Sequence, residues 1–172
     1  MRIFLLGLPG SGKTTIGGAL ASQLHLKFVD LDAEIEKNAG DSITSIFSKK
    51  GENHFREIEK KELEKWCIEV DSFVMATGGG TPCFYDNLSL MKLSGLTIFL
   101  DVPVRVIADR LRQTALENRP LFARTSSEEL EGHLELLRSK RISYYHLADH
   151  TVEGSEIGIS TLLQIIKTGT PR

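Results

Sequence analysis

The sequence has few of the features that mark membrane, secreted or nucleic-acid-binding proteins. Its apolar runs are short, whereas a transmembrane helix needs roughly 20 consecutive apolar residues. The net charge is −2, and neither a basic run nor an acidic tail is present. Met1 leads directly into a strand-like segment, so we expect no signal peptide. These absences predict a cytoplasmic protein that binds neither a membrane nor nucleic acid.

Cysteine is scarce as well, and the two that occur, Cys67 and Cys83, follow no recognisable pattern. A disulfide, metal ligands or nucleophiles could each use such a pair, but we interpret them as two reduced thiols. The histidines show no metal-ligand spacing and are interpreted as surface residues; they are His25, His54, His133, His146 and His150. The 172 residues suit one domain, residues 1–172, with a single core.

Short apolar runs alternate with helical patterns along the chain. Strands are expected at residues 2–6, 27–30, 72–76 and 96–100, and a fainter pattern marks 148–152. Helical spacing covers residues 15–24, 33–38, 42–49, 52–70, 104–113, 127–145 and 156–166. This alternation favours an α/β fold in which helices cover both faces of a parallel sheet.

The most informative segment is residues 7–14, which read G-L-P-G-S-G-K-T and match the phosphate-binding pattern G-x-x-x-x-G-K-[ST]. It lies between a strand and a helix, where backbone N–H groups and the helix dipole can hold an anion. Lys13 is expected to reach the β- and γ-phosphates, and Thr14 to ligate Mg²⁺. The alternative is a chance glycine-rich turn. The complete motif predicts nucleoside triphosphate binding by Gly10, Ser11, Gly12, Lys13, Thr14 and Thr15.

Other motifs narrow the class of nucleotide-binding protein. The guanine-reading N-K-x-D tetrad and a D-x-x-G motif are both absent, which argues against a GTP-binding switch. The chain is too short for most mechanical ATPases with their additional elements. A small kinase remains, and residues 113–127, polar, irregular and broken by Pro120, form its candidate mobile lid.

Asp30 and Asp32 close the second expected strand. Ligands of such parallel sheets gather at the carboxyl ends of the strands, which is also where the phosphate-binding loop lies. Two carboxylates one residue apart on an extended segment point the same way. One could then hold the water shell of a metal while the other accepts a hydroxyl proton. Alternatively, Asp32 only caps the following helix.

Two more motifs indicate a second ligand. Arg56, in the helical stretch F-R-E-I-E, is a residue type that grips a carboxylate through two parallel hydrogen bonds. The alternative is an exposed arginine paired with Glu59 or another neighbour. The three glycines 78–80 directly follow the third expected strand. Three consecutive glycines favour a close approach of the backbone to a ligand over a generic turn.

In this order and spacing, the motifs resemble those of the shikimate kinases over nearly the whole chain. The matching segments are G-L-P-G-S-G-K-T-T, F-V-D-L-D-A-E-I-E, A-G-D-S-I-T-S-I-F, G-E-N-H-F-R-E-I-E, A-T-G-G-G, N-R-P-L-F and R-I-S-Y-Y-H-L-A-D. The resemblance implies ATP-dependent phosphorylation of the 3-hydroxyl of shikimate, on the route to chorismate and aromatic amino acids. It also implies a P-loop kinase three-layer sandwich with a five-stranded parallel sheet of order 2-3-1-4-5.

The resemblance further implies roles for individual residues. Asp32 would bind the shikimate hydroxyls and accept the proton of the attacking one, within a shikimate-binding region at about residues 32–60. Asp30 would orient one Mg²⁺ through water, with Thr14 as its ligand. The substrate carboxylate would be clamped by Arg56 and Arg141, with backbone N–H contacts from Gly78, Gly79 and Gly80.

The implied nucleotide contacts add Arg112, lying against the adenine, and the lid arginine Arg119, which would act in catalysis together with Lys13 and Asp32. The family is usually monomeric, so we expect a monomer with ATP and shikimate as its partners.

Two stretches depart from the family pattern. Leu121 is followed by Phe122 rather than a second leucine, and Ser143-Tyr144 replace the usual Pro-Leu before Tyr145. Both replacements keep an apolar or aromatic body. Arg138 competes with Arg141 for the carboxylate, but only Arg141 stands four residues before Tyr145. A gluconate-type kinase and a non-catalytic nucleotide-binding module are the alternative functions.

Overall fold

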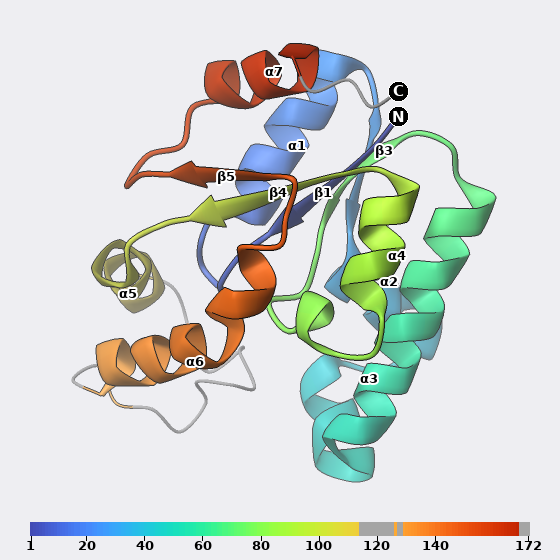
Figure 1. The fold of residues 1–172 in the computed structure, drawn as a ribbon. Helices are drawn as coiled ribbons and strands as arrows, with labels where there is room; N and C mark the ends of the chain where they lie inside the picture. The colour runs from blue at the N-terminus through green and yellow to red at the C-terminus, as the bar shows by residue number, and fades with distance from the viewer. Residues whose placement is uncertain (114–125, 127–128, 169–172) are drawn as a thin grey trace.

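The computed structural model describes residues 1–113, 126 and 129–168 of the chain (Figure 1). Five parallel strands form one sheet in the order β2-β3-β1-β4-β5, which confirms the predicted order. Every expected strand is present, with boundaries that differ by at most two residues. The strands are β1 (Arg2–Leu6), β2 (Lys27–Asp30), β3 (Phe73–Ala76), β4 (Leu96–Asp101) and β5 (His150–Glu153).

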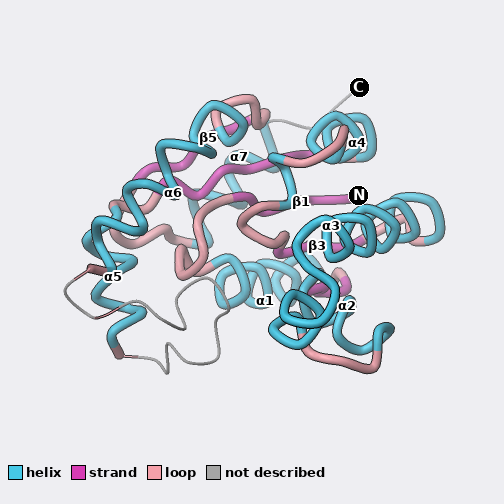
Figure 2. Tube along the Cα trace, turned by 90° about the horizontal axis from the view of Figure 1, so that it is seen from below, coloured by secondary structure: helices cyan, strands magenta, loops and turns pink. Residues whose placement is uncertain are grey.

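Helices lie around the strands, which are magenta in Figure 2, and cover both faces of the sheet, so the side chains of the strands alternate between two apolar cores. In β1, Ile3 and Leu5 belong to one core, whereas Phe4 and Leu6 belong to the other. The first core is closed by α1 (Lys13–Leu24) and α7 (Ile159–Thr168), which lie together on one side of the sheet in Figure 1. The opposite core receives side chains from α2 (Leu31–Ala39), α3 (Ile43–Glu69), α4 (Asn87–Ser94), α5 (Val104–Arg112) and α6 (Leu130–Tyr145). The three-layer sandwich is thereby confirmed.

The long helix α3 is anchored to the sheet by aromatic side chains. Trp66 meets the Phe73 ring edge-on at 5.7 Å between centroids, and Phe73 meets Phe4 in the same way at 5.5 Å. Such edge-to-face pairs add stabilisation beyond the apolar area that they bury. Because Leu63 on the same helix is also completely buried, the preceding turns of α3 hold a fixed position over the carboxyl end of the sheet.

The structure agrees with the two helices expected over residues 42–49 and 52–70, because the backbone of α3 is non-helical at Gly51, where φ is +80° and the helix is kinked. It differs from the expected helices in two places. Helix α4 and the short 3-10 helix η1 (Thr81–Cys83) were missed. Helix α4 is only 8 residues long, and its buried Leu88 and Met91 give little periodic signal in so short a segment.

Among the described residues, no helix has both the length and the apolarity to cross a membrane.

Candidate active site

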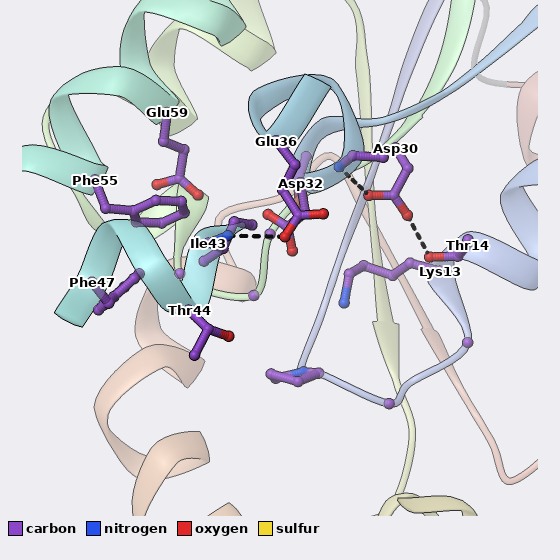
Figure 3. A pocket seen from close by; sticks show the side chains of 18 of the residues that line it. Lys13, Thr14, Asp30, Asp32, Glu36, Ile43, Thr44, Phe47, Phe55 and Glu59 are labelled. Carbon is purple, nitrogen blue, oxygen red and sulfur yellow. Dashed lines mark hydrogen bonds between the residues drawn. The ribbon is translucent and has the colours of Figure 1, made fainter. Parts of the chain in front are cut away.

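The carboxyl ends of the strands open into a cavity of about 750 Å³, in the upper part of the range for small-molecule pockets. Its walls come from the phosphate-binding loop, the start of α2, the first half of α3 and the glycines after β3. Helix α5 adds Arg110 and Leu111, and helix α6 adds Arg141. Figure 3 shows part of this wall, with Lys13 and Thr14 on one side and Phe55 and Glu59 on the other. The cavity therefore joins the nucleotide motif to the candidate substrate residues.

The phosphate-binding loop follows β1 and leads into α1, as expected. Gly10 and Gly12 have φ values of +83° and +95°, which side chains other than glycine rarely adopt. The buried Lys13 ammonium donates hydrogen bonds to the carbonyls of Gly7 and Leu8, at 2.9 and 2.8 Å. These bonds hold a cation directly over the loop, where it adds to the positive end of the α1 dipole.

Asp30 links the phosphate-binding loop to α2. Its Oδ2 accepts a hydrogen bond from the Thr14 hydroxyl at 2.8 Å, and its Oδ1 accepts one from the backbone N–H of Ala33 at 3.3 Å. Asp30 is therefore the N-cap of α2. The structure thus brings the two expected metal-site residues together, and their hard oxygens suit a Mg²⁺ that takes its other ligands from water and phosphates. Among the described residues, no cluster of three or more histidine, cysteine or acidic residues could hold a metal by itself.

The expected geometry of Asp32 was wrong in one respect. Asp32 lies in the first turn of α2 rather than on an extended segment, so strand alternation does not relate it to Asp30. Both residues nevertheless line the cavity, because the helix begins directly at the end of β2. Asp30, and not Asp32, caps the helix, so the alternative role considered for Asp32 belongs to its neighbour.

Asp32 has an unusual electrostatic environment. Its pKa is raised from 3.8 to about 6, mainly by burial and also by the negative charges of Glu59 and Asp30, whereas the positive charges of Lys13 and Arg56 lower it. Figure 3 shows Asp32 on the cavity side of α2, between the side chains of Lys13 and Glu59. A carboxyl group with such a pKa can accept and release a proton near neutral pH.

Arg56 is buried at the cavity wall rather than exposed. It pairs with Glu59, as the alternative interpretation expected, through a 2.8 Å contact from Nη1 to Oε2. Its Nε and Nη2 donate to the half-exposed Glu52 at 3.3 and 3.1 Å. The guanidinium also stacks on the Phe84 ring at 4.2 Å. Arg56 is therefore a fixed, buried cation beside the cavity.

Arg141 supplies a second buried cation from α6. Among the described residues, none forms a hydrogen bond with its buried Nη1, and a buried cationic donor without a partner is costly. Arg138 is committed elsewhere, because its Nη2 lies 3.1 and 2.9 Å from the carboxylate oxygens of Asp101. One turn beyond Arg141, the Tyr145 hydroxyl donates to the Gly79 carbonyl at 2.6 Å. Arg141 is thus the arginine placed to receive an anion in the cavity.

The three glycines after β3 make room for the side chains of the site. A Cβ at Gly78 would lie 2.9 Å from Asp32, Glu59 and Thr81 oxygens, and one at Gly79 would lie 3.1 Å from Nη1 of Arg141. A Cβ at Gly80 would lie 2.8 Å from both Cζ and Nη1 of Arg56. The three glycines were predicted to let the backbone approach a ligand. The structure shows that the charged side chains of the site themselves require this space. Substrate contacts by these backbone N–H groups stay a prediction.

Replacing Gly80 with alanine should therefore weaken binding of an anionic phosphoryl acceptor at Arg56. The φ of Gly80 is −91°, which alanine adopts without strain, so the added methyl group acts on the Arg56 guanidinium. Displacing a charged hydrogen-bond donor should raise the KM for the acceptor roughly tenfold or more and leave the KM for ATP unchanged. Steady-state kinetics test this, with Gly132→Ala as control because nothing lies within 4 Å of a Cβ there. An unchanged KM for the acceptor would contradict the assignment of Arg56.

Arg112, which the family resemblance places against the adenine, lies at the end of α5. Arg112 is exposed and pairs with Asp109 and Glu131 at 2.8 and 3.0 Å, and it does not line the cavity. Arg110 lines it instead, donating to the carbonyls of Ser11 at 3.3 Å and Ser155 at 2.6 Å. The position of Arg112 against the adenine remains a prediction. Residues 114–125, which include Arg119, and 127–128 lie outside the described residues, and with them nearly all of the expected lid.

Several residues of the cavity wall were not predicted as residues of the site, although Glu59 was considered as a partner of Arg56. Glu59 is completely buried beside Arg56, and Glu36 accepts the backbone N–H of Ile43 at 2.9 Å. Each lies three or four residues from a predicted site residue, so helical spacing from Arg56 and Asp32 could have found them. The apolar part of the wall, which includes Phe47 and Phe55, had no comparable signal in the sequence.

A phosphate-binding loop, a carboxyl group of raised pKa and two buried arginines in one cavity define a small P-loop kinase for an anionic, hydroxyl-bearing substrate. A sequence profile described as shikimate kinase matches residues 9–168. The chain is 43% identical over 156 residues to a shikimate kinase of Phocaeicola vulgatus, an alignment that covers 91% of this chain and 88% of that protein. The chain belongs to the shikimate kinase family.

Solved structures agree with this assignment. The crystal structure of shikimate kinase from Bacteroides thetaiotaomicron is similar at a TM-score of 0.87 and 35% identity, covering 98% of this chain and 97% of that one. Shikimate kinase from Acinetobacter baumannii, determined in complex with shikimate, is similar at a TM-score of 0.88 and 33% identity, covering 99% and 95%.

Proposed function

We propose that this cavity transfers the γ-phosphoryl group of ATP to the 3-hydroxyl of shikimate, the activity of the family, through the residues assigned from the sequence. The proposal rests on one observation: the anion-binding loop, Asp32 and the two buried arginines line the same cavity. The product is shikimate 3-phosphate, an intermediate of chorismate and aromatic amino acid biosynthesis.

Asp32 is the general base in this proposal. Its carboxylate accepts the proton of the 3-hydroxyl as that oxygen attacks the γ-phosphorus and the bond to the β-phosphate oxygen breaks, which releases ADP. Lys13 offsets negative charge on the transferred group, while the backbone of Gly10–Thr15 holds the other phosphates. Thr14 and, through water, Asp30 would hold a Mg²⁺ ion, which would supply further positive charge to the phosphates.

The substrate carboxylate binds between Arg56 and Arg141. Nη1 of Arg141 supports this, because a buried donor without a partner among the described residues gains most from an anionic ligand. Phe47 and Phe55, whose rings lie 4.7 Å apart between centroids, provide an apolar wall for the carbon ring of the substrate.

A coupled ATPase assay with shikimate, with gluconate and without an acceptor tests the proposed function. We expect rapid ADP release only with shikimate. Turnover with gluconate would favour the gluconate-type kinase, and no turnover with either acid would favour the non-catalytic module. We further propose that the protein is a cytoplasmic monomer with a single domain over residues 1–172. Light scattering after size-exclusion chromatography measures its oligomeric state.

The proposed lid, residues 113–127, gives a further prediction. Arg119 would compensate charge on the transferring phosphoryl group, so Arg119→Ala should lower kcat by about 10²–10³ and change ATP affinity less. Arg105→Ala, an exposed arginine of α5, is the control and should leave kcat unchanged. Hydrogen exchange over 113–127 should slow when ATP analogue and shikimate are both bound. Equal exchange in the free and ternary states would contradict closure.

A further inference from the structure

The segment that follows the three glycines contacts the site through Thr81. Thr81 is completely buried, and its hydroxyl donates a 2.7 Å hydrogen bond to Oε1 of Glu59. Its backbone is fixed as well, because the N–H donates to the Gly78 carbonyl at 3.1 Å and the carbonyl accepts from Nδ2 of Asn87 at 3.0 Å. Hydrogen bonds to Gly78 before η1 and to Asn87 after it therefore hold Thr81, and with it the hydroxyl, in place.

Glu59 uses one carboxylate oxygen for each of two partners. Oε1 accepts from Thr81, and Oε2 accepts from Nη1 of Arg56 at 2.8 Å. The terminal torsion of a glutamate is broad and roughly two-fold, so a carboxylate held by one partner alone can turn. The Thr81 bond removes that freedom and presents Oε2 to the arginine in one orientation.

The same segment supports Arg56 from a second side. Phe84, the residue after η1, stacks on the guanidinium at 4.2 Å. The remaining polar partner of Arg56, Glu52, is half exposed, whereas Glu59 is completely buried. The orientation of Arg56 at the cavity wall therefore depends mainly on the pair formed with Glu59 and, through it, on Thr81.

We propose that Thr81 is a positioning residue for the phosphorylation of shikimate, acting through Glu59 to hold Arg56 in the orientation that binds the substrate carboxylate. The inference rests on the proposed function and adds to it a residue outside the phosphate-binding and arginine motifs. Thr81 does not line the cavity, so its effect on the substrate is indirect.

Thr81→Val tests the proposal because it deletes the hydroxyl and keeps the branched shape. We expect the KM for shikimate to rise about 10- to 100-fold, the usual effect of losing a hydrogen bond to a charged group, with the KM for ATP within about twofold of normal. Thr81→Ser, which restores the hydroxyl, should return the KM for shikimate most of the way to normal.

Thr97→Val is the matched control. Thr97 is also completely buried, and its hydroxyl donates 2.7 Å to a carboxylate oxygen of Asp149, but it lies at the amino end of β4, away from the cavity. This variant should lose stability as Thr81→Val does, measured as Tm, without a change in the KM for shikimate. If Thr81→Val does not fold, Thr81→Ala removes the same hydroxyl with no risk of crowding.

The experiment distinguishes a failure of the proposed function from a failure of the role proposed for Thr81. If the unaltered protein does not phosphorylate shikimate, the proposed function fails. If it does, and the hydroxyl-deleted variant keeps the normal KM for shikimate, Thr81 is only a packing residue and this inference fails. Equal kinetic changes in Thr81→Val and Thr97→Val would also overturn it, because they would report general destabilisation.

Discussion

Asp32→Asn should lower kcat by about 10²–10⁴, the usual range for losing a positioned general base. Asparagine keeps the size and the helical position of the side chain but cannot accept the hydroxyl proton. ATP affinity should stay nearly normal, because the phosphates are held by Lys13 and the loop backbone. Single-turnover kinetics with separate measurement of nucleotide binding test both parts. A variant with near-normal kcat would remove Asp32 from the chemistry.

The same substitution should make the protein more stable at pH 7. The folded pKa of about 6 lies above the unfolded value near 3.8, so the folded protein binds this proton more tightly. Stability is therefore gained as the pH falls through 6, and the ionised carboxylate is unfavourable above it. A neutral asparagine should add about 1–3 kcal/mol to the unfolding free energy at pH 7. Denaturant unfolding should show a smaller difference at pH 4, where Asp32 is protonated in the folded protein.

The second large effect concerns the substrate carboxylate. Shikimate carboxamide should be phosphorylated about 10⁴-fold or more slowly than shikimate, in kcat/KM, because the neutral amide leaves buried ionic groups without a partner. The loss arises from Arg56 and Arg141 together. Nη1 of Arg141 is buried without a hydrogen-bond partner among the described residues, so an anionic ligand stabilises it most. Equal turnover of acid and amide would remove the basis for assigning both arginines.

A variant sharpens this test. Arg141→Ala should slow turnover of the acid far more than that of the amide, so the preference for the acid should shrink. Arg138→Ala is the control, because Arg138 is bound to Asp101 and lies outside the cavity wall. A preference that stays constant in Arg141→Ala would show that the carboxylate binds elsewhere.

Much of the fold could be predicted because its signals are local. Each strand is a short apolar run between turns, and residues 7–14 combine a complete motif with a strand before and a helix after. Helix α4 and η1 gave no such signal, since each is short and is formed by contacts with distant segments. The start of α2 was placed too late for a related reason. Its cap is Asp30, which the sequence pattern assigns equally well to the end of a strand.

The nucleotide-binding motif, the succession of strands and helices along the chain, and the candidate residues Asp32 and Arg56 could be read from the amino-acid sequence, because they depend on residue type and spacing. Arg141 was identified only through the resemblance to the shikimate kinases. The pairing of the charged groups became visible only in the three-dimensional structure. Glu59 is buried between Arg56 and Thr81, and Arg138 pairs with Asp101. Glycines 78–80 leave space for the charged side chains of the site. The physical reason is that burial and pairing arise where separate elements converge at the end of the sheet, and these distances are not encoded in any single segment.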